Sequence, residues 1–159
     1  MQEAAKWGAI LAVTIVVLNT IFILTGLHAN PIVGGPVFII LAIGANVAAV
    51  FMALRATAAS STFGLQLLNG AVLGVVGGIL VLLLVWPLLA VVFPNSLDEM
   101  RAGYIEMMEA TGVDQALQDK AIEQMNRATP LSQATPGAIG TLLTSIVAGG
   151  AIGIFKRQK

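Results

Sequence analysis

The residues of this chain best suited to bind a ligand are those with uncharged polar side chains inside apolar segments. Amide and hydroxyl groups donate and accept hydrogen bonds, so several together could hold a lipid or a neutral solute in a polar pocket. They could equally join one helix to another, at about 1 kcal/mol or less per hydrogen bond. The set comprises Asn19, Asn46, Gln66, Asn69, Thr141, Thr144 and Ser145.

Part of this set falls at a similar depth along its segments. A helical rise of 1.5 Å per residue places Asn19, Asn46, Thr144 and Ser145 roughly 12–18 Å from the segment ends, so these side chains could meet. We favour interhelical hydrogen bonds for them. The alternative is a cavity lined by Asn19, Asn46 and Asn69.

Side chains that act as nucleophiles, proton carriers or metal ligands are scarce. Cysteine is absent, which removes disulfides, thiolate chemistry and sulfur-bound metals. His28 is the only histidine, and we interpret it as an ordinary interfacial residue, because catalysis and metal binding both need convergent partners. We therefore expect no catalytic residue, no metal site, no cofactor and no enzyme activity.

The composition indicates a membrane protein. Apolar residues make up 57% of the 159 positions and charged residues 10%, against roughly 45–50% and about 25% in soluble domains. The net charge of zero argues against a nucleic-acid partner, which would need clustered Lys and Arg. A lipid bilayer is therefore the expected surroundings.

Apolar segments long enough to cross a bilayer define the predicted fold. About 20 mainly apolar residues in a helix span the hydrocarbon core. Four segments qualify, and they are Trp7–Leu27, Ile32–Leu54, Gly64–Phe93 and Gly137–Phe155. The third is longer than required and must tilt, begin outside the hydrocarbon, or kink near Pro87. We predict an all-α integral membrane bundle of four helices, with spans 1–3 in residues 1–93, a polar insert in 94–136, and span 4 with a basic tail in 137–159.

None of these segments carries Asp, Glu, Lys or Arg at membrane depth. Ion-coupled carriers and proton relays usually keep such a group despite its cost of several kcal/mol. The sequence therefore argues against ion-coupled transport.

Charges outside the segments predict the orientation. Lys6, Arg55 and the tail residues Lys156, Arg157 and Lys159 would share one side of the membrane, which is the cytoplasmic side by the positive-inside rule. Both termini are then cytoplasmic. The insert, with seven acids against three bases, is expected on the extracytoplasmic side.

The insert is predicted to be a helical hairpin. Ser96 and Glu99 have the spacing of a capping box at a helix start, and Gly112 is a stop signal. Apolar residues recur at helical spacing on both sides of that glycine. These are Leu97, Met100, Tyr104 and Met108 before it, and Val113, Leu117, Ala121 and Met125 after it. The segment Thr129–Pro136 (TPLSQATP) is interpreted as a linker.

Glycines recur every fourth residue in two segments. Gly70, Gly74 and Gly78 mark the third segment, and Gly149 and Gly153 mark the fourth. Small residues at this spacing let two helix backbones approach closely in lipid. We predict that these faces pack against another helix, either of this chain or of a partner.

The stretch STFGLQLLNGAVLGVVGGILVLLLVWPLLAVVFP, followed by a polar insert and a small-residue last span, resembles a family of small bacterial membrane proteins, domain of unknown function 4199. The resemblance rests on Phe63 and Gly64 before a glycine-bearing span and on Pro94 closing it. It covers most of the chain and implies a four-span protein of the bacterial cytoplasmic (inner) membrane. It implies no activity, cofactor or catalytic residue.

Two functions follow as hypotheses. The first is a non-enzymatic accessory or scaffold subunit that associates with another membrane protein, or with itself, through the glycine faces. The alternative is binding or transport of a lipid or neutral solute in a cavity within the bundle.

Overall fold

A computed structural model describes residues 1–57 and 62–155 of the chain, and 88% of these described residues are helical. No strand occurs in these ranges, so the prediction of an all-α fold is confirmed. The elements in chain order are α1 (Gln2–Leu24), η1 (Leu27–Ala29), α2 (Gly34–Thr57), α3 (Phe63–Pro87), η3 (Leu88–Val92), α4 (Ser96–Ala110), α5 (Gln115–Asn126) and α6 (Pro130–Phe155).

Four helices are long and apolar enough to cross a membrane, namely α1, α2, α3 with η3, and α6. Only 22–28% of the most apolar 18-residue stretch of each is buried within the chain. Most of their apolar side chains therefore face outward, and a bilayer is the solvent that accepts such a surface. The protein is a multi-pass membrane protein.

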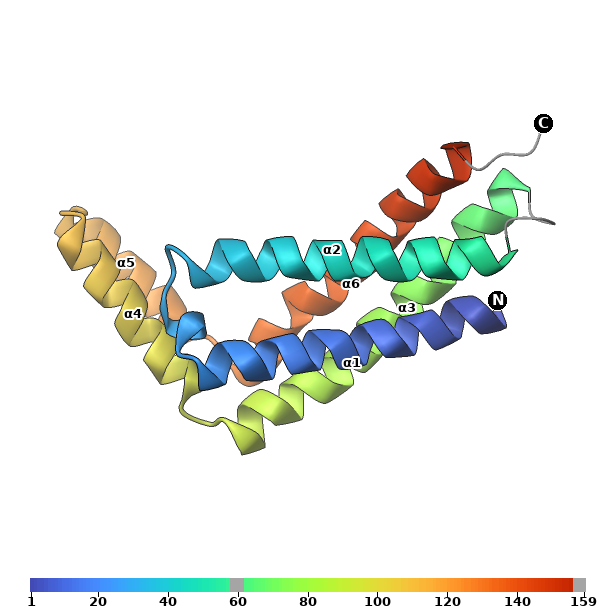
Figure 1. Ribbon diagram of the computed structural model, residues 1–159. Helices are drawn as coiled ribbons and strands as arrows, with labels where there is room; N and C mark the ends of the chain where they lie inside the picture. The colour runs from blue at the N-terminus through green and yellow to red at the C-terminus, as the bar shows by residue number, and fades with distance from the viewer. Residues whose placement is uncertain (58–61, 156–159) are drawn as a thin grey trace.

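The four long helices run up and down in sequence (Figure 1). Helix α3 packs most extensively on α6, α1 lies along α3, and α2 covers α1 and part of α6. The start of α1 and the end of α6 lie at one end of the bundle, and α4 and α5 lie at the opposite end, here called the hairpin end (Figure 1). Leu11, Val50, Leu73 and Val81 are buried where the four helices meet.

The third span leaves α-helical geometry at the predicted place. Pro87 ends α3, and the next residues form a π-helical turn in which the Phe93 amide donates to the Leu88 carbonyl, five residues back, at 2.9 Å. Proline has no amide hydrogen and crowds the preceding turn, which disrupts a regular helix.

Helices α4 and α5 form the hairpin. The reversal is at Gly112, whose φ of +66° is a conformation that glycine adopts without strain. The Val113 amide donates to the Met108 carbonyl at 3.1 Å, which completes the helix end. Pairing between the two helices is partial, because Leu117 remains 61% exposed.

Helix α4 begins at Ser96, as expected, but not through a capping box. The Ser96 hydroxyl donates to the Phe93 carbonyl at 2.7 Å instead of capping an amide. The Glu99 carboxylate turns away from the helix start toward His28, with 3.0 Å between Glu99 Oε2 and His28 Nε2. Glu99 thus approaches His28 of the α1–α2 turn and not a backbone amide at the start of α4.

The predicted linker Thr129–Pro136 is wrong. Helix α6 begins at Pro130, so residues 130–136 are helical and continuous with the segment predicted to be the fourth span. The Ser132 amide donates to Thr129 Oγ1 at 3.1 Å, and the Thr129 amide donates to Ser132 Oγ at 2.8 Å. These reciprocal bonds cap the helix, and proline is favoured at its first position.

Candidate functional site

The glycines of α3 face the small residues of α6. A Cβ atom on Gly70 would stand 2.9 Å from the Ser145 carbonyl oxygen, and one on Gly78 would stand 2.8 Å from the Ala138 oxygen. Gly74 is equally confined, with 2.9 Å to Ser145 Cβ. The face on which all three glycines lie is thus covered by α6 of the same chain.

The α6 glycines belong to the same seam. A Cβ on Gly149 would lie 3.1 Å from Gly70 Cα, and one on Gly153 would lie 3.0 Å from Gln66 Oε1. The structure therefore brings the two stripes against each other.

A second close contact, between α1 and α3, was not recognised in the sequence. A Cβ on Gly8 would stand 2.7 Å from the Leu73 carbonyl oxygen, and one on Gly77 would stand 3.3 Å from the Gly8 oxygen. Gly8 has no other glycine four residues before or after it, so no spacing pattern marks it.

Asn46 and Ser145 form a buried polar cluster between α2 and α6, with side chains 3% and 0% exposed. Asn46 Nδ2 donates to the Thr141 carbonyl at 3.0 Å. Ser145 Oγ lies 2.9 Å from Asn46 Oδ1 and 2.7 Å from the Thr141 carbonyl oxygen, and its single hydrogen serves one of them at a time. These groups join two helices.

The other polar residues do not join this cluster. The Asn19 side chain donates to the Ile15 carbonyl of its own helix at 2.9 Å, and the Thr141 hydroxyl likewise donates to Gly137 at 2.8 Å. Gln66 and Asn69 are buried, and their amide oxygens Oε1 and Oδ1 accept no hydrogen bond.

A cavity of about 530 Å³, here called the deep lobe, lies in the half of the bundle toward the hairpin end. Its walls are Ile39, Ile43 and Asn46 of α2 and Gly140, Thr141 and Thr144 of α6, with residues of α1 and α3 between them. Asn19 and Asn46 both line it, while Asn69 does not. The predicted three-asparagine cavity therefore contains two of its members.

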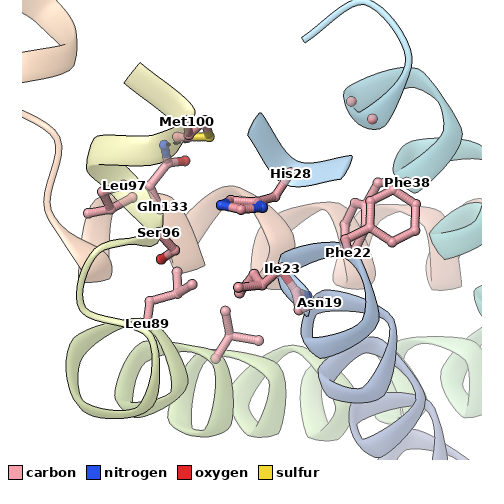
Figure 2. A pocket seen from close by; sticks show the side chains of 13 residues that line it. Asn19, Phe22, Ile23, His28, Phe38, Leu89, Ser96, Leu97, Met100 and Gln133 are labelled. Carbon is pink, nitrogen blue, oxygen red and sulfur yellow. Dashed lines mark hydrogen bonds between the residues drawn. The ribbon is translucent and has the colours of Figure 1, made fainter. Parts of the chain in front are cut away.

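A smaller cavity of about 230 Å³, the hairpin lobe, lies beside the deep lobe. The two share Asn19, Phe38, Val85 and Gln133 in their linings. Figure 2 shows the hairpin lobe, with His28 between Met100 and Gln133 on one side and Phe22 and Phe38 on the other. Leu97 and Ser96 of α4 close its hairpin side.

His28 is the most unusual side chain in this lining. Its side chain is 12% exposed, and its Nε2 atom is 3.0 Å from Glu99 Oε2. That contact lacks hydrogen-bond geometry, and neither ring nitrogen has a hydrogen-bond partner within the part of the chain that the structure describes. We regard the contact as an electrostatic approach between side chains and not as a formed hydrogen bond.

The sequence comparison places the chain in a family. The family model described as protein of unknown function (DUF4199) matches residues 6–158. The chain belongs to this family. No curated protein and no solved structure matches it.

In this DUF4199 chain the two lobes are lined by apolar and uncharged polar side chains together with His28. Among the described residues, no Asp, Glu, Lys or Arg lines either lobe. Within residues 1–57 and 62–155, no three His, Cys, Asp or Glu side chains lie close enough together to hold a metal ion. The arrangement offers hydrogen bonds and apolar surface, which suits a neutral molecule with a hydrocarbon part.

Proposed function

We propose that this protein binds a lipid or another neutral amphiphile inside its membrane bundle. The observation that carries the proposal is the pair of adjoining lobes, about 530 and 230 Å³, whose linings are mainly apolar. Ligand pockets in proteins commonly measure roughly 300–1,000 Å³ and combine apolar walls with a few polar groups. The two lobes together fall in this volume range, and their walls are likewise apolar with a few polar groups.

The shape of the deep lobe suits a hydrocarbon chain. On α2 its lining extends from Phe38 to Asn46. Those eight helical steps correspond to roughly 12 Å at 1.5 Å per residue. Asn46 and Thr141, already hydrogen-bonded to each other, close the far end without presenting an unpaired polar group to an apolar tail.

The position of the deep lobe between α2 and α6 would let a lipid enter it from the bilayer. Helices α2 and α6 both contribute to the deep lobe, and both are candidate membrane spans. Ile39, Ile43 and Gly140 line the lobe and are also exposed on the surface of the chain. A lipid tail can therefore move between bilayer and lobe without crossing water.

The test fills the deep lobe at Gly140. A Cβ built there meets no described atom within 4 Å, and Gly140 lines the lobe, so Gly140→Leu is designed to reduce the ligand volume. Gly44→Leu is the matched control, because Gly44 is also a helical glycine with no atom near its Cβ and does not line either lobe. Each buried methylene contributes about 0.8 kcal/mol, so the loss of two contacts weakens binding by roughly tenfold.

Binding would be measured by native mass spectrometry of the full chain released from nanodiscs of bacterial lipid. We expect lipid adducts on the wild type and on Gly44→Leu, and about tenfold fewer on Gly140→Leu. Equal adduct levels on all three proteins would refute the proposal.

The accessory or scaffold function remains a prediction. The glycine faces that motivated it contact each other between α3 and α6, so a partner would have to bind elsewhere on the bundle. Location in a bacterial inner membrane, with cytoplasmic termini and an extracytoplasmic hairpin, also remains a prediction.

A further inference from the structure

The hairpin lobe contains an imidazole whose ring nitrogens lack a hydrogen-bond partner among the described residues. His28 Nδ1 and Nε2 are both shielded from solvent, and no side chain or backbone group of residues 1–57 and 62–155 forms a hydrogen bond with them. A buried polar group without a hydrogen bond is unfavourable. A ligand that forms a hydrogen bond with this imidazole would therefore bind more tightly than one that does not.

The ring is fixed in position by its own segment. The turn between α1 and α2 is stabilised by Asn30, whose Oδ1 accepts from the Ile32 and Val33 amides at 3.2 and 3.0 Å. Gly103 of α4 lies against the Ala29 carbonyl so closely that no side chain would fit there. His28 is thus held between this turn and α4, and it faces the lobe (Figure 2).

Glu99 determines which hydrogen bond His28 can offer. The Glu99 carboxylate oxygen lies 3.0 Å from Nε2 without hydrogen-bond geometry, but its negative charge disfavours a lone pair on that atom, so the neutral ring carries its proton on Nε2. Nδ1 is then a bare acceptor inside the lobe, and it requires a donor from the ligand. A hydroxyl group is an uncharged lipid headgroup that supplies one.

Charge excludes the common anionic headgroups. No described Lys or Arg lines either lobe, so a carboxylate or phosphate there would lack a permanent counter-charge from residues 1–57 and 62–155. The Glu99 carboxylate beside His28 adds like-charge repulsion.

We propose that the ligand is an uncharged lipid with a free hydroxyl group, which donates to His28 Nδ1 in the hairpin lobe while its hydrocarbon tail occupies the deep lobe. This assignment rests on the proposed function. Asn19 and Gln133 line both lobes and therefore mark the junction between headgroup and tail.

Three probes with the same tail test the headgroup: 1-hexadecanol, its methyl ether and hexadecanoate. Tritiated 1-hexadecanol would be bound to the full chain in detergent and displaced by each unlabelled probe. We expect 1-hexadecanol to compete about tenfold better than the ether, which cannot donate, and better than the anion. His28→Leu should abolish this preference, and His28→Asn, whose amide oxygen still accepts, should retain part of it.

Gly140→Leu separates the two proposals. If the wild type binds 1-hexadecanol and Gly140→Leu weakens that binding, but ether and anion compete equally well, the headgroup assignment is overturned and the cavity stands. An unchanged preference in His28→Leu overturns the assignment as well. If the wild type binds no tritiated probe, or binds it no better than Gly140→Leu, the proposed function fails.

Discussion

Gly70 and Gly149 meet across the seam between α3 and α6, and a Cβ on Gly149 would stand 3.1 Å from Gly70 Cα. Gln66 and Gly153 extend the same contact toward the end of α6, with 3.0 Å between a Cβ on Gly153 and Gln66 Oε1. Between helices in lipid, where no hydrophobic effect drives association, close approach of this kind supplies van der Waals contact. The seam is therefore the central packing element of the bundle.

Enlarging a seam glycine should destabilise the fold. Gly74→Leu would force a side chain against Ser145 and the α6 backbone, where even a Cβ stands 2.9 Å from Ser145 Cβ. Overpacking costs about 1–3 kcal/mol, which corresponds to roughly 2–12 °C in Tm for a chain of this size. Circular dichroism melts in detergent would measure it, with Gly44→Leu as the control. Similar Tm values for the two variants would contradict the packing role.

The Asn46–Ser145 cluster should show measurable coupling. We expect a double-mutant cycle of Asn46→Ala and Ser145→Ala to give a coupling of about 0.6 kcal/mol, and at most about 1.7. Asn19 is the comparison, because its side chain bonds only within α1, to Ile15. A cycle of Asn19→Ala with Ser145→Ala should therefore be additive. Additivity in the Asn46 cycle would show that the hydrogen bonds across α2 and α6 contribute nothing net.

Single cysteines would test the membrane orientation, since the native chain has none. Glu106→Cys lies on an exposed position of α4, and Gln2→Cys lies at the start of α1 at the opposite end of the bundle. A membrane-impermeant maleimide should label Glu106→Cys in intact cells and Gln2→Cys only after lysis. The reverse pattern would invert the predicted topology.

Removing the α6 cap should loosen the first turns of that helix. Ser132→Ala deletes the hydroxyl that accepts from the Thr129 amide at 2.8 Å. Loss of a capping interaction typically costs about 1 kcal/mol, so amide exchange over residues 131–135 should quicken about fivefold. Thr135→Ala is a suitable control, because its hydroxyl bonds only the Leu131 carbonyl within the helix. Equal exchange in both variants would show that the cap does not hold this turn.

The spans and the helical hairpin were predictable because their causes are local. A run of about 20 apolar residues in lipid has few structures available other than a helix. Gly112 and the apolar periodicity beside it similarly act over a few residues. The start of α6 was missed because its cap depends on a reciprocal Thr129–Ser132 pair, whereas the composition of TPLSQATP is typical of loops.

The site was less predictable because it depends on contacts between distant segments. Nothing in the sequence pairs His28 with Glu99, which are 71 positions apart and on different elements. The glycine spacing indicated close packing, but the choice between an internal and an external partner follows from the placement of α3 beside α6. The lobes likewise arise from how α2 and α6 are placed, which no single segment encodes.

Gly103 fits so closely against Ala29 that no side chain would fit where α4 meets the α1–α2 turn. His28 is the neighbour of Ala29 and approaches Glu99, so the same turn meets α4 at two successive residues. Any displacement of α4 against this turn would therefore change the surroundings of the imidazole at the edge of the hairpin lobe.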